Sequence, residues 1–255
     1  MAIKDTLGAL RNSVDRLREL VRPLTDDALI EHAYPSAWSI ADVLSHIGSS
    51  AVIFERRLDD SLAGRETPPE FAEGVWAEWD HKSPRAKADD GVAADGAFMA
   101  RLEALGGDDR ERVSIAFGPV TFGWDELVRA RLNEHLLHEW DVAVALEPTA
   151  TPAPEGVALV IDNLDLIGRY TAQPVAPERT ITIATSEPDR AFSVTVETKT
   201  VDFSTLDSLS DPTLTMPAEA FIRLVYGRLD PEHTPPSVAG DQLALDQLRE
   251  VFPGP

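Results

Sequence analysis

The sequence predicts a two-domain α+β protein, in which an N-terminal four-helix bundle precedes a smaller C-terminal α+β domain with a short antiparallel sheet. Three observations lead to this prediction. Apolar residues recur at helical spacing as far as residue 146, a proline-containing stretch follows at 148–154, and alternation of apolar and polar residues starts only at residue 180. We therefore place the domain boundary so that the domains are 1–150 and 151–255.

Four main helices are expected in the first domain, because apolar residues there repeat every three or four positions. Ser39 and Asp42 form the Ser-x-x-acid pattern of a capping box, which predicts where the second helix begins. Gly106-Gly107 is expected to end the third helix, and Pro148 the fourth. The expected ranges are 7–21, 39–62, 91–105 and 124–146 for the main helices, with a brief helix at 26–31, a loop with a short helical piece at 64–90, and a small hairpin at 113–122 around Gly118-Pro119.

The second domain is expected to mix helices and strands. Thr180 to Ala184 and Phe192 to Val196 alternate with period two, as half-buried strands do. The remaining expected elements are a helix at 155–170, a short strand at 214–216, a helix at 217–226 and a last helix at 241–252.

Charge and cysteine content narrow the possible functions. The 255 residues include 23 basic and 44 acidic side chains, a net charge of −21, and no cysteine. So acidic a chain argues against a general nucleic-acid binder or a protein that binds anionic membranes. Without cysteine, any metal must be held by His, Asp or Glu, and any reactive thiol must arrive with a small molecule. We find no leader-like or membrane-spanning apolar stretch, and expect a cytoplasmic protein.

Candidate metal ligands lie on two of the expected helices. Glu134 and His138 are four residues apart, so they share one helix face, and Asp141 continues the same stripe between apolar flanks. His46 lies in the middle of the second main helix. Two helices that direct such groups into a bundle core can build a metal site. His135 is offset by about a quarter-turn from this stripe and is expected to lie outside the site.

The residues alone leave the metal open. His46, Glu134 and His138 would form a His2Glu set, which suits zinc with an open position for water or substrate. Two histidines and one carboxylate also bind non-haem iron. In a third interpretation, Glu134 and His138 form an ordinary surface pair and His46 is a hydrogen-bonded core histidine.

Two motifs in the first domain resemble a known family. The segment from Trp38 to His46, followed by Glu134-x-x-x-His138-x-x-Asp141, is similar to the metal-binding helices of DinB-like four-helix bundles. It looks most like the mycothiol-dependent maleylpyruvate isomerase family of actinobacteria. In the second domain, Tyr226-Gly227-Arg228 and Gly240-Asp241 resemble that family's C-terminal motifs.

This resemblance implies a zinc ion held by His46, Glu134 and His138. It also implies that Arg228 reaches a cleft between the domains and binds an anionic group of the substrate there. We expect Asp141 to take part by orienting a ligand imidazole.

The function implied is that of a zinc-dependent maleylpyruvate-type cis–trans isomerase or thiol S-transferase. Its partners would be a small thiol, mycothiol above all, and an electrophile or unsaturated acid. A non-haem iron enzyme on the same ligands and a non-catalytic helical binding or regulatory module are the alternatives. The sequence does not fix the oligomeric state, and a monomer is compatible with it.

Overall fold

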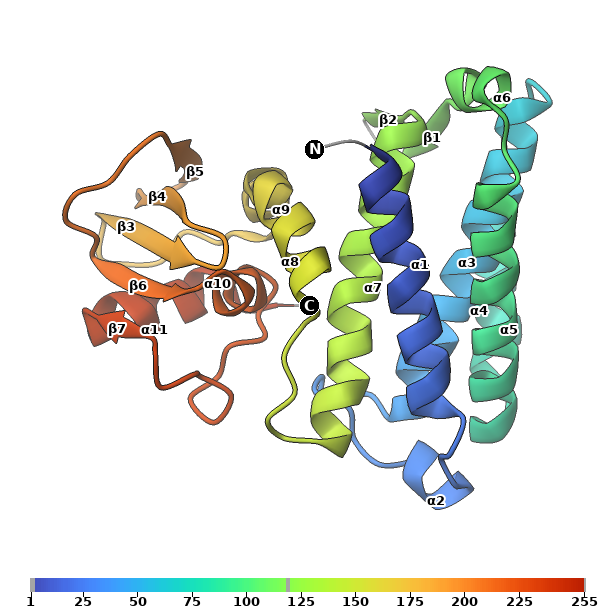
Figure 1. Cartoon of the computed structure of the whole chain (residues 1–255), viewed down its shortest axis with the longest axis horizontal. Helices are drawn as coiled ribbons and strands as arrows, with labels where there is room; N and C mark the ends of the chain where they lie inside the picture. Colours follow the sequence, from blue (N-terminus) through green and yellow to red (C-terminus); the bar gives the residue numbers. More distant parts are fainter. Residues whose placement is uncertain (1–2, 118–119, 255) are drawn as a thin grey trace. The chain divides into compact units, whose positions relative to one another are not determined.

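The computed structural model of the protein describes residues 3–117 and 120–254 and divides into two compact units (Figure 1). The chain passes from the first unit to the second between Thr151 and Pro152. The two units together contain both helices and a sheet, which confirms the predicted α+β class. Within the described ranges, every helix is too short or too polar to cross a lipid bilayer.

The first unit is helical apart from one hairpin. Its elements are α1 (Ile3–Val21), α2 (Asp26–Leu29), α3 (Ile40–Leu62), α4 (Glu70–Asp80), α5 (Pro84–Glu103), α6 (Gly107–Arg112), β1 (Ile115–Phe117), β2 (Val120–Phe122) and α7 (Trp124–Leu146). Four long helices form the bundle, with α1 packed along α7 and α3 along α5 (Figure 1). The predicted hairpin is present as β1 and β2, which pair antiparallel, while its expected turn at Gly118-Pro119 lies outside the described residues.

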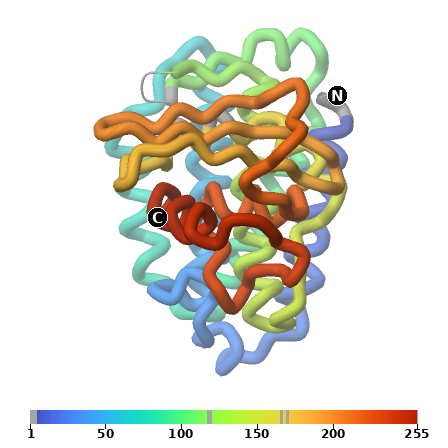
Figure 2. The backbone as a smooth tube through the Cα atoms, turned by 90° about the vertical axis from the view of Figure 1, so that its left-hand side faces the viewer, coloured from blue at the N-terminus to red at the C-terminus, as the bar shows by residue number. Residues whose placement is uncertain are grey.

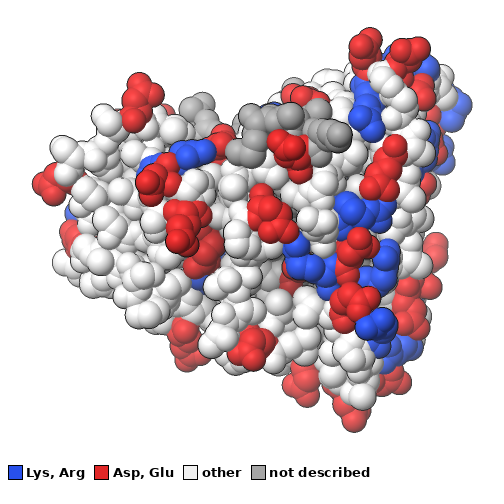
Figure 3. All heavy atoms as spheres, in the orientation of Figure 1, with Lys and Arg blue, Asp and Glu red and all other residues white. Residues whose placement is uncertain are grey.

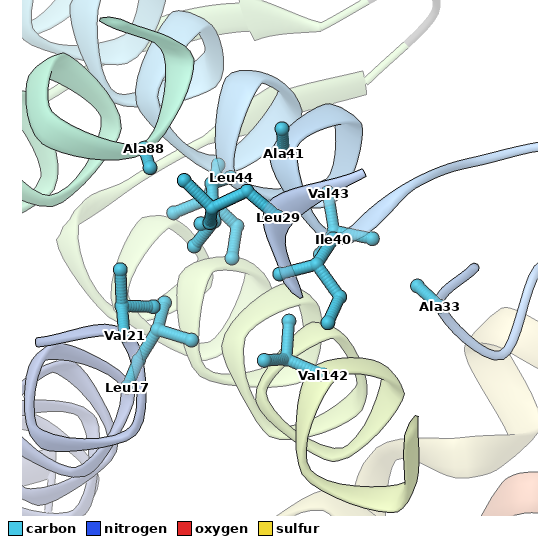
Figure 4. Packing of buried hydrophobic residues seen from close by; sticks show 11 residues of the cluster. Leu17, Val21, Leu29, Ala33, Ile40, Ala41, Val43, Leu44, Ala88 and Val142 are labelled. Carbon is cyan, nitrogen blue, oxygen red and sulfur yellow. The ribbon is translucent and has the colours of Figure 1, made fainter. Parts of the chain in front are cut away.

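The core at one end of the bundle joins all the long helices. Helices α1, α2, α3, α5 and α7 all contribute side chains to one apolar cluster, most of which Figure 4 shows at close range. Its buried members are Leu17, Val21, Leu29, Ala33, Ile40, Ala41, Val43, Leu44, Ile47, Ala88 and Val142. Burial of apolar surface shared by these five helices fixes the positions of α3 and α7 relative to each other.

The start of α3 agrees with its sequence signal, whereas the start of α5 does not. Ser39 and Asp42 form the predicted capping box at the N-terminus of α3. The third main helix, α5, begins at Pro84 instead of near Gly91, because Ser83 caps it and proline is favourable at the first helical position. The expected loop at 64–90 accordingly contains all of α4 and the first turns of α5. A short helix, α6, follows Gly106 where only a helix end was predicted.

The second unit combines short helices with a five-stranded sheet. Its elements are α8 (Pro154–Val160), the 3-10 segment η1 (Ile161–Asn163), α9 (Leu164–Thr171), β3 (Arg179–Ser186), β4 (Arg190–Val196), β5 (Val201–Leu206), β6 (Leu214–Pro217), α10 (Ala218–Val225), β7 (Ala239–Gly240) and α11 (Gln242–Val251). The strand order is β5-β4-β3-β6-β7, and Figure 2 shows the longer strands side by side in yellow and orange.

The sheet differs from the predicted one in two respects. Strands β5 and β7 were not predicted, and β6 pairs parallel with β3, with Ile183 opposite Leu214, so the sheet is mixed and not purely antiparallel. The expected helix at 155–170 is interrupted at Ile161–Asn163, where the backbone tightens to a 3-10 turn. On one side of the sheet, the rings of Phe192, Phe203 and Phe221 pack together in the core of this unit.

Charged side chains of both signs alternate on the surface of the first unit. In the orientation of Figure 3, basic and acidic groups are interspersed over the part of the view that α1 and α5 occupy in Figure 1. Ion pairs explain this mixture: Arg11 of α1 pairs with Glu103 of α5, and Arg101 of α5 pairs with Asp59 of α3. Such exposed pairs contribute at most about 1 kcal/mol each.

Candidate metal centre

Three predicted ligands from two helices converge in the first unit. His46 projects from α3, and Glu134 and His138 project from successive turns of α7. One donor atom from each lies within 4.8 Å of the other two. Nε2 of His46 lies 3.2 Å from Oε2 of Glu134, and Nε2 of His138 lies 3.6 Å from the same oxygen. The structure therefore brings together the residues that the sequence singles out, and they form a group able to hold a metal ion.

Asp141 forms a hydrogen bond with one of the candidate ligand rings. Its side chain is fully buried, and its Oδ2 accepts a hydrogen bond of 2.9 Å from Nδ1–H of His138. A proton on Nδ1 leaves the lone pair of the neutral imidazole on Nε2, which faces Glu134 and the rest of the cluster. Metal-binding histidines commonly have such a carboxylate behind the ring.

The electrostatics of the cluster favour a bound cation. Burial raises the pKa of Glu134, but its interactions with the imidazoles of His138 and His46 outweigh this effect and hold the pKa well below its ordinary value. Burial lowers the pKa of His138, yet its hydrogen bond to Asp141 and the nearby carboxylate of Glu134 outweigh burial and raise the pKa overall. Glu134 is therefore ionised at neutral pH, and a divalent ion can take the place of the imidazolium charge.

The donor set fits a catalytic metal. Two imidazole nitrogens and one carboxylate oxygen are the protein ligands of many zinc enzymes, in which a further position stays open. His138 is buried, whereas the side chains of His46 and Glu134 are 35% and 44% exposed. A small molecule can therefore approach the cluster from the side of His46 and Glu134. The same donors suit ferrous iron, so the ligand set does not distinguish the two metals.

An aromatic ring beside the cluster was missed by the sequence analysis. Trp38, which precedes the capping residue Ser39, lies against the rings of both His46 and His138. Trp38 lies at the start of the Trp38–His46 motif, but nothing in the sequence indicates the direction of its side chain. That direction depends on a turn in residues 31–40 whose hydrogen bonds appear only in the folded chain.

The opposite side of α7 carries a second, separate polar network. His135 is fully buried, and its Nε2 lies 2.9 Å from Asp95 of α5, to which Arg131 also donates. Its Nδ1 lies 3.3 Å from Oγ of Ser13, which donates to Glu139. Burial raises the pKa of Asp95, but His135 and Arg131 more than offset this and lower it. His135 thus lies outside the metal cluster, as its angular offset on the helix predicts, and links α7 to α1 and α5.

Arg228 is buried in the second unit. Only 4% of the residue is exposed, and Nη1 donates a hydrogen bond of 2.9 Å to the backbone carbonyl of Tyr226. Nη1 of Arg223 in turn donates to the carbonyl of Arg228. The segment that follows α10 is thereby ordered by two arginines, and the predicted role of Arg228 in binding an anion stays a prediction.

A cavity elsewhere in the first unit is a weaker candidate. Its volume is about 650 Å³, and its lining comes from one face of α1 and the C-terminal half of α7. The lining residues are Asn12, Asp15, Arg16, Glu19, Leu20, Glu139 and Ala143. None of the three candidate metal ligands lines it, and Arg16 is already engaged with Glu139. The convergence of His46, Glu134 and His138 therefore identifies the candidate site better than cavity size does.

Comparisons with known proteins agree with this geometry. The family model described as "Mycothiol maleylpyruvate isomerase N-terminal domain" matches residues 10–143, more than half of the chain, and the match includes all three metal-ligand candidates. A crystal structure of the mycothiol-dependent maleylpyruvate isomerase is similar, with a TM-score of 0.67, 14% identity, and coverage of 89% of this chain and 90% of that chain. A histidine-to-alanine mutant of the mycothiol-dependent maleylpyruvate isomerase matches with the same TM-score and coverage, at 13% identity. No curated protein matches the sequence.

Proposed function

Because the chain belongs to the mycothiol maleylpyruvate isomerase N-terminal domain family, we propose that it is a zinc-dependent enzyme that uses a small thiol, mycothiol above all, as cosubstrate. The observation that supports this proposal best is the convergence of His46, Glu134 and His138 from two helices onto one point. The absence of cysteine from the sequence adds a chemical argument, since the chain cannot supply a thiol itself.

The residues of the cluster have distinct tasks in this proposal. His46, Glu134 and His138 bind the ion, and Asp141 keeps the proton on Nδ1 of His138 so that Nε2 can face the ion. A bound zinc ion would lower the pKa of a coordinated thiol and so supply a nucleophile at neutral pH. The partial exposure of Glu134 and His46 leaves room for the thiol and the second substrate to enter.

We propose cis–trans isomerisation of a maleylpyruvate-type acid as the reaction. The thiolate sulfur adds to one carbon of the double bond, and the electron pair of that bond moves onto the activating carbonyl. Rotation about the resulting single bond follows, and the return of the electron pair expels the thiolate and restores the double bond in the trans form. In the S-transferase version, a proton is taken up at the neighbouring carbon and the new C–S bond is retained.

Arg228 is the proposed binding group for the carboxylate of the substrate. A guanidinium can hold a carboxylate by two parallel hydrogen bonds, and local positive charge is needed in a chain of net charge −21. We expect Arg228→Lys to raise KM for a dicarboxylate at least tenfold in steady-state kinetics. Arg190→Lys, at an ion pair with Asp162 in the same unit, is the control and should leave KM unchanged. Equal KM values for Arg228→Lys and wild type would remove Arg228 from the proposal.

Metal analysis tests the central point. Protein purified anaerobically should contain one zinc ion per chain by elemental analysis, and His46→Ala or His138→Ala should abolish metal retention. His81→Ala is the matched control, because His81 is an exposed histidine outside the cluster. Unchanged metal content in both ligand variants would contradict the site. Stoichiometric iron in place of zinc would favour the second candidate, a non-haem iron enzyme on the same three ligands.

The reaction class needs a separate assay. Zinc-loaded protein is incubated with maleylpyruvate and mycothiol, and then with other small thiols. Formation of the trans isomer with catalytic amounts of thiol supports the isomerase, whereas accumulation of a thioether by mass spectrometry supports the S-transferase. Turnover of neither kind across the thiols and unsaturated acids tested would favour a metal-binding module without catalysis.

A further inference from the structure

We infer that Trp38 is a positioning residue of the metal centre: its indole holds the imidazoles of His46 and His138 in the orientation that an ion requires, before the ion binds. The inference deepens the proposed function and rests on it, because it concerns the same three ligands.

The ring geometry is the first observation. The ring centroids of Trp38 and His46 are 5.3 Å apart, those of Trp38 and His138 are 6.0 Å apart, and those of the two imidazoles are 4.8 Å apart. The planes of Trp38 and His138 are within 20° of parallel, whereas the imidazoles meet edge to face at 63°. The indole therefore lies beside both imidazoles at once, so that it can restrict the orientations of both rings.

The backbone around Trp38 is the second observation. The residue lies in a tight turn, in which its N–H donates to the carbonyl of Pro35 at 2.8 Å and its own carbonyl accepts from Ala33 N–H at 3.0 Å. The base of the turn is closed by Ile40 N–H, which donates to the carbonyl of Glu31 at 2.9 Å. With both of its backbone groups engaged, Trp38 has little freedom to move away from the histidines.

Both ends of this turn are attached to the helices that carry the ligands. At its C-terminal end, Ser39 caps α3, and Asp42 of the same capping box accepts a 2.7 Å hydrogen bond from Lys87 of α5. At its other end, Tyr34 N–H donates to the backbone carbonyl of Asp141 in α7 at 3.2 Å, and the Tyr34 ring packs against Trp140. The turn thus bridges α3 and α7, with Trp38 at the point where their histidines meet.

His46 depends on this ring more than His138 does. His138 has the buried carboxylate of Asp141 behind its Nδ1. Among the described residues, the hydrogen-bond partner found for the His46 ring is Glu134, which is itself a ligand. The side chain of His46 is also 35% exposed, so close packing restricts it less. Contact with Trp38 therefore supplies the orientation that a carboxylate supplies to His138.

Competition titration of metal-free protein with zinc against a chelator of known affinity tests the inference. For Trp38→Leu we expect the zinc Kd to rise about 10- to 100-fold, the usual effect of removing a residue that orients a ligand. Trp38→Phe, which retains a ring, should stay within about threefold of wild type. Trp76→Leu is the matched control, because Trp76 is a half-exposed tryptophan of α4 outside the cluster, and its zinc Kd should not change.

A second readout follows the rings directly. In NMR spectra of the metal-free protein, the His46 ring signals should be sharp in wild type and in Trp38→Phe, and exchange-broadened in Trp38→Leu. Should Trp38→Leu not fold, Trp38→Met carries the same expectations, because its flexible side chain fills space without fixing a ring plane.

The outcomes separate the two proposals. Equal zinc Kd and equally sharp His46 signals in wild type and Trp38→Leu would overturn the role of Trp38 and leave the proposed function intact. Wild-type protein that binds no zinc would overturn the proposed function. In that case the NMR comparison still decides whether Trp38 orders the imidazoles.

Discussion

In the proposed metal site, the hydrogen bond between His138 and Asp141 would orient one candidate ligand imidazole. Asp141→Asn keeps a hydrogen-bond acceptor but removes the negative charge behind the ring, so we expect the zinc Kd to rise about tenfold in competition titration. Asp230→Asn provides a matched control, since Asp230 contacts Nδ1 of His233 at the same distance of 2.9 Å and the same spacing in the sequence. An equal loss of zinc affinity in both variants would contradict the orienting role of Asp141.

A second buried carboxylate, that of Asp60, makes the stability of the fold depend on pH in the acid range. The Asp60 side chain is 1% exposed and accepts from Arg56, Arg65 and Thr67, and these hydrogen bonds lower its pKa to about 2. A carboxylate whose pKa is lowered in the folded protein stabilises the fold fully above its ordinary pKa. This stabilisation disappears as the pH falls from about 4 to about 2. The Tm difference between wild type and Asp60→Asn should therefore be largest near neutral pH and shrink towards pH 2. A constant difference would contradict this assignment.

At the residue scale, the sequence predicts the candidate ligands but not the long-range contacts that hold α7 against its neighbouring helices. Glu134, His138 and Asp141 share a helix face by spacing alone, which is a local property of one segment. The contact of His135 with Ser13 joins residues 122 positions apart, and its contact with Asp95 joins residues 40 apart. No periodicity encodes such pairs, because they exist only once α1, α5 and α7 are packed.

Among the elements, α3 and α5 approach each other closely at Gly91. A Cβ at Gly91 of α5 would lie 2.5 Å from the backbone carbonyl oxygen of Leu44 in α3. We expect Gly91→Ala to destabilise the protein by about 1–3 kcal/mol in chemical unfolding, although alanine favours helix by about 1 kcal/mol.

The exposed Gly74 within α4 provides the comparison for this prediction. A Cβ there meets nothing within 4 Å, so Gly74→Ala should stabilise the protein by about 0.5–1 kcal/mol. The opposite signs expected for the two substitutions separate backbone contact from helix propensity. Stabilisation by both substitutions would show that α3 and α5 can move apart at no cost.

The same contact explains why the sequence misplaces the start of α5. Read alone, Gly91 resembles a helix boundary, since glycine is unfavourable inside helices. In the fold it lies within α5, because only a residue without a side chain allows the two backbones to approach so closely. By contrast, the capping box at Ser39 and Asp42 is a local signal, and α3 begins where it predicts.

At the scale of the whole molecule, the two units should respond to different perturbations. All three candidate ligands lie in the first unit, whereas Phe203 packs with Phe192 and Phe221 in the core of the second. Zinc at about 100 times its Kd should stabilise the protein by about 2.7 kcal/mol, and Phe203→Leu should destabilise it by about 1–2 kcal/mol.

Calorimetry with and without zinc measures both effects in the same scans. Separate sites give additive effects, so the zinc-induced rise in Tm of the first unit should be the same in Phe203→Leu as in wild type. His46→Ala should abolish that rise. A zinc response that disappears in Phe203→Leu would show that the second unit participates in metal binding.

The fold class was predictable because composition changes along the chain at residues 148–154, where helical periodicity gives way to alternation. The sheet was harder to predict. Strand β5 alternates apolar and polar residues only over residues 201–204, and it is placed by pairing with β4. The two-residue β7 is too short to show any alternation and is placed by pairing with β6. The parallel pairing of β3 with β6 requires the chain to cross back past β4 and β5 before β6 forms. Local alternation of apolar and polar residues does not predict such a connection.

Helix α7 also determines where the chain tolerates changes in length. Its Glu134 and His138 lie beside His46 of α3, whereas His135 contacts α5 and Glu139 contacts α1. Most of the residues of α7 are buried. Inserting one residue before Glu134 would turn all that follows by about 100° and direct each polar set towards the wrong partner. Homologous chains should therefore vary in length in the segments between helices, such as residues 63–69, and keep the count of residues within α7 constant.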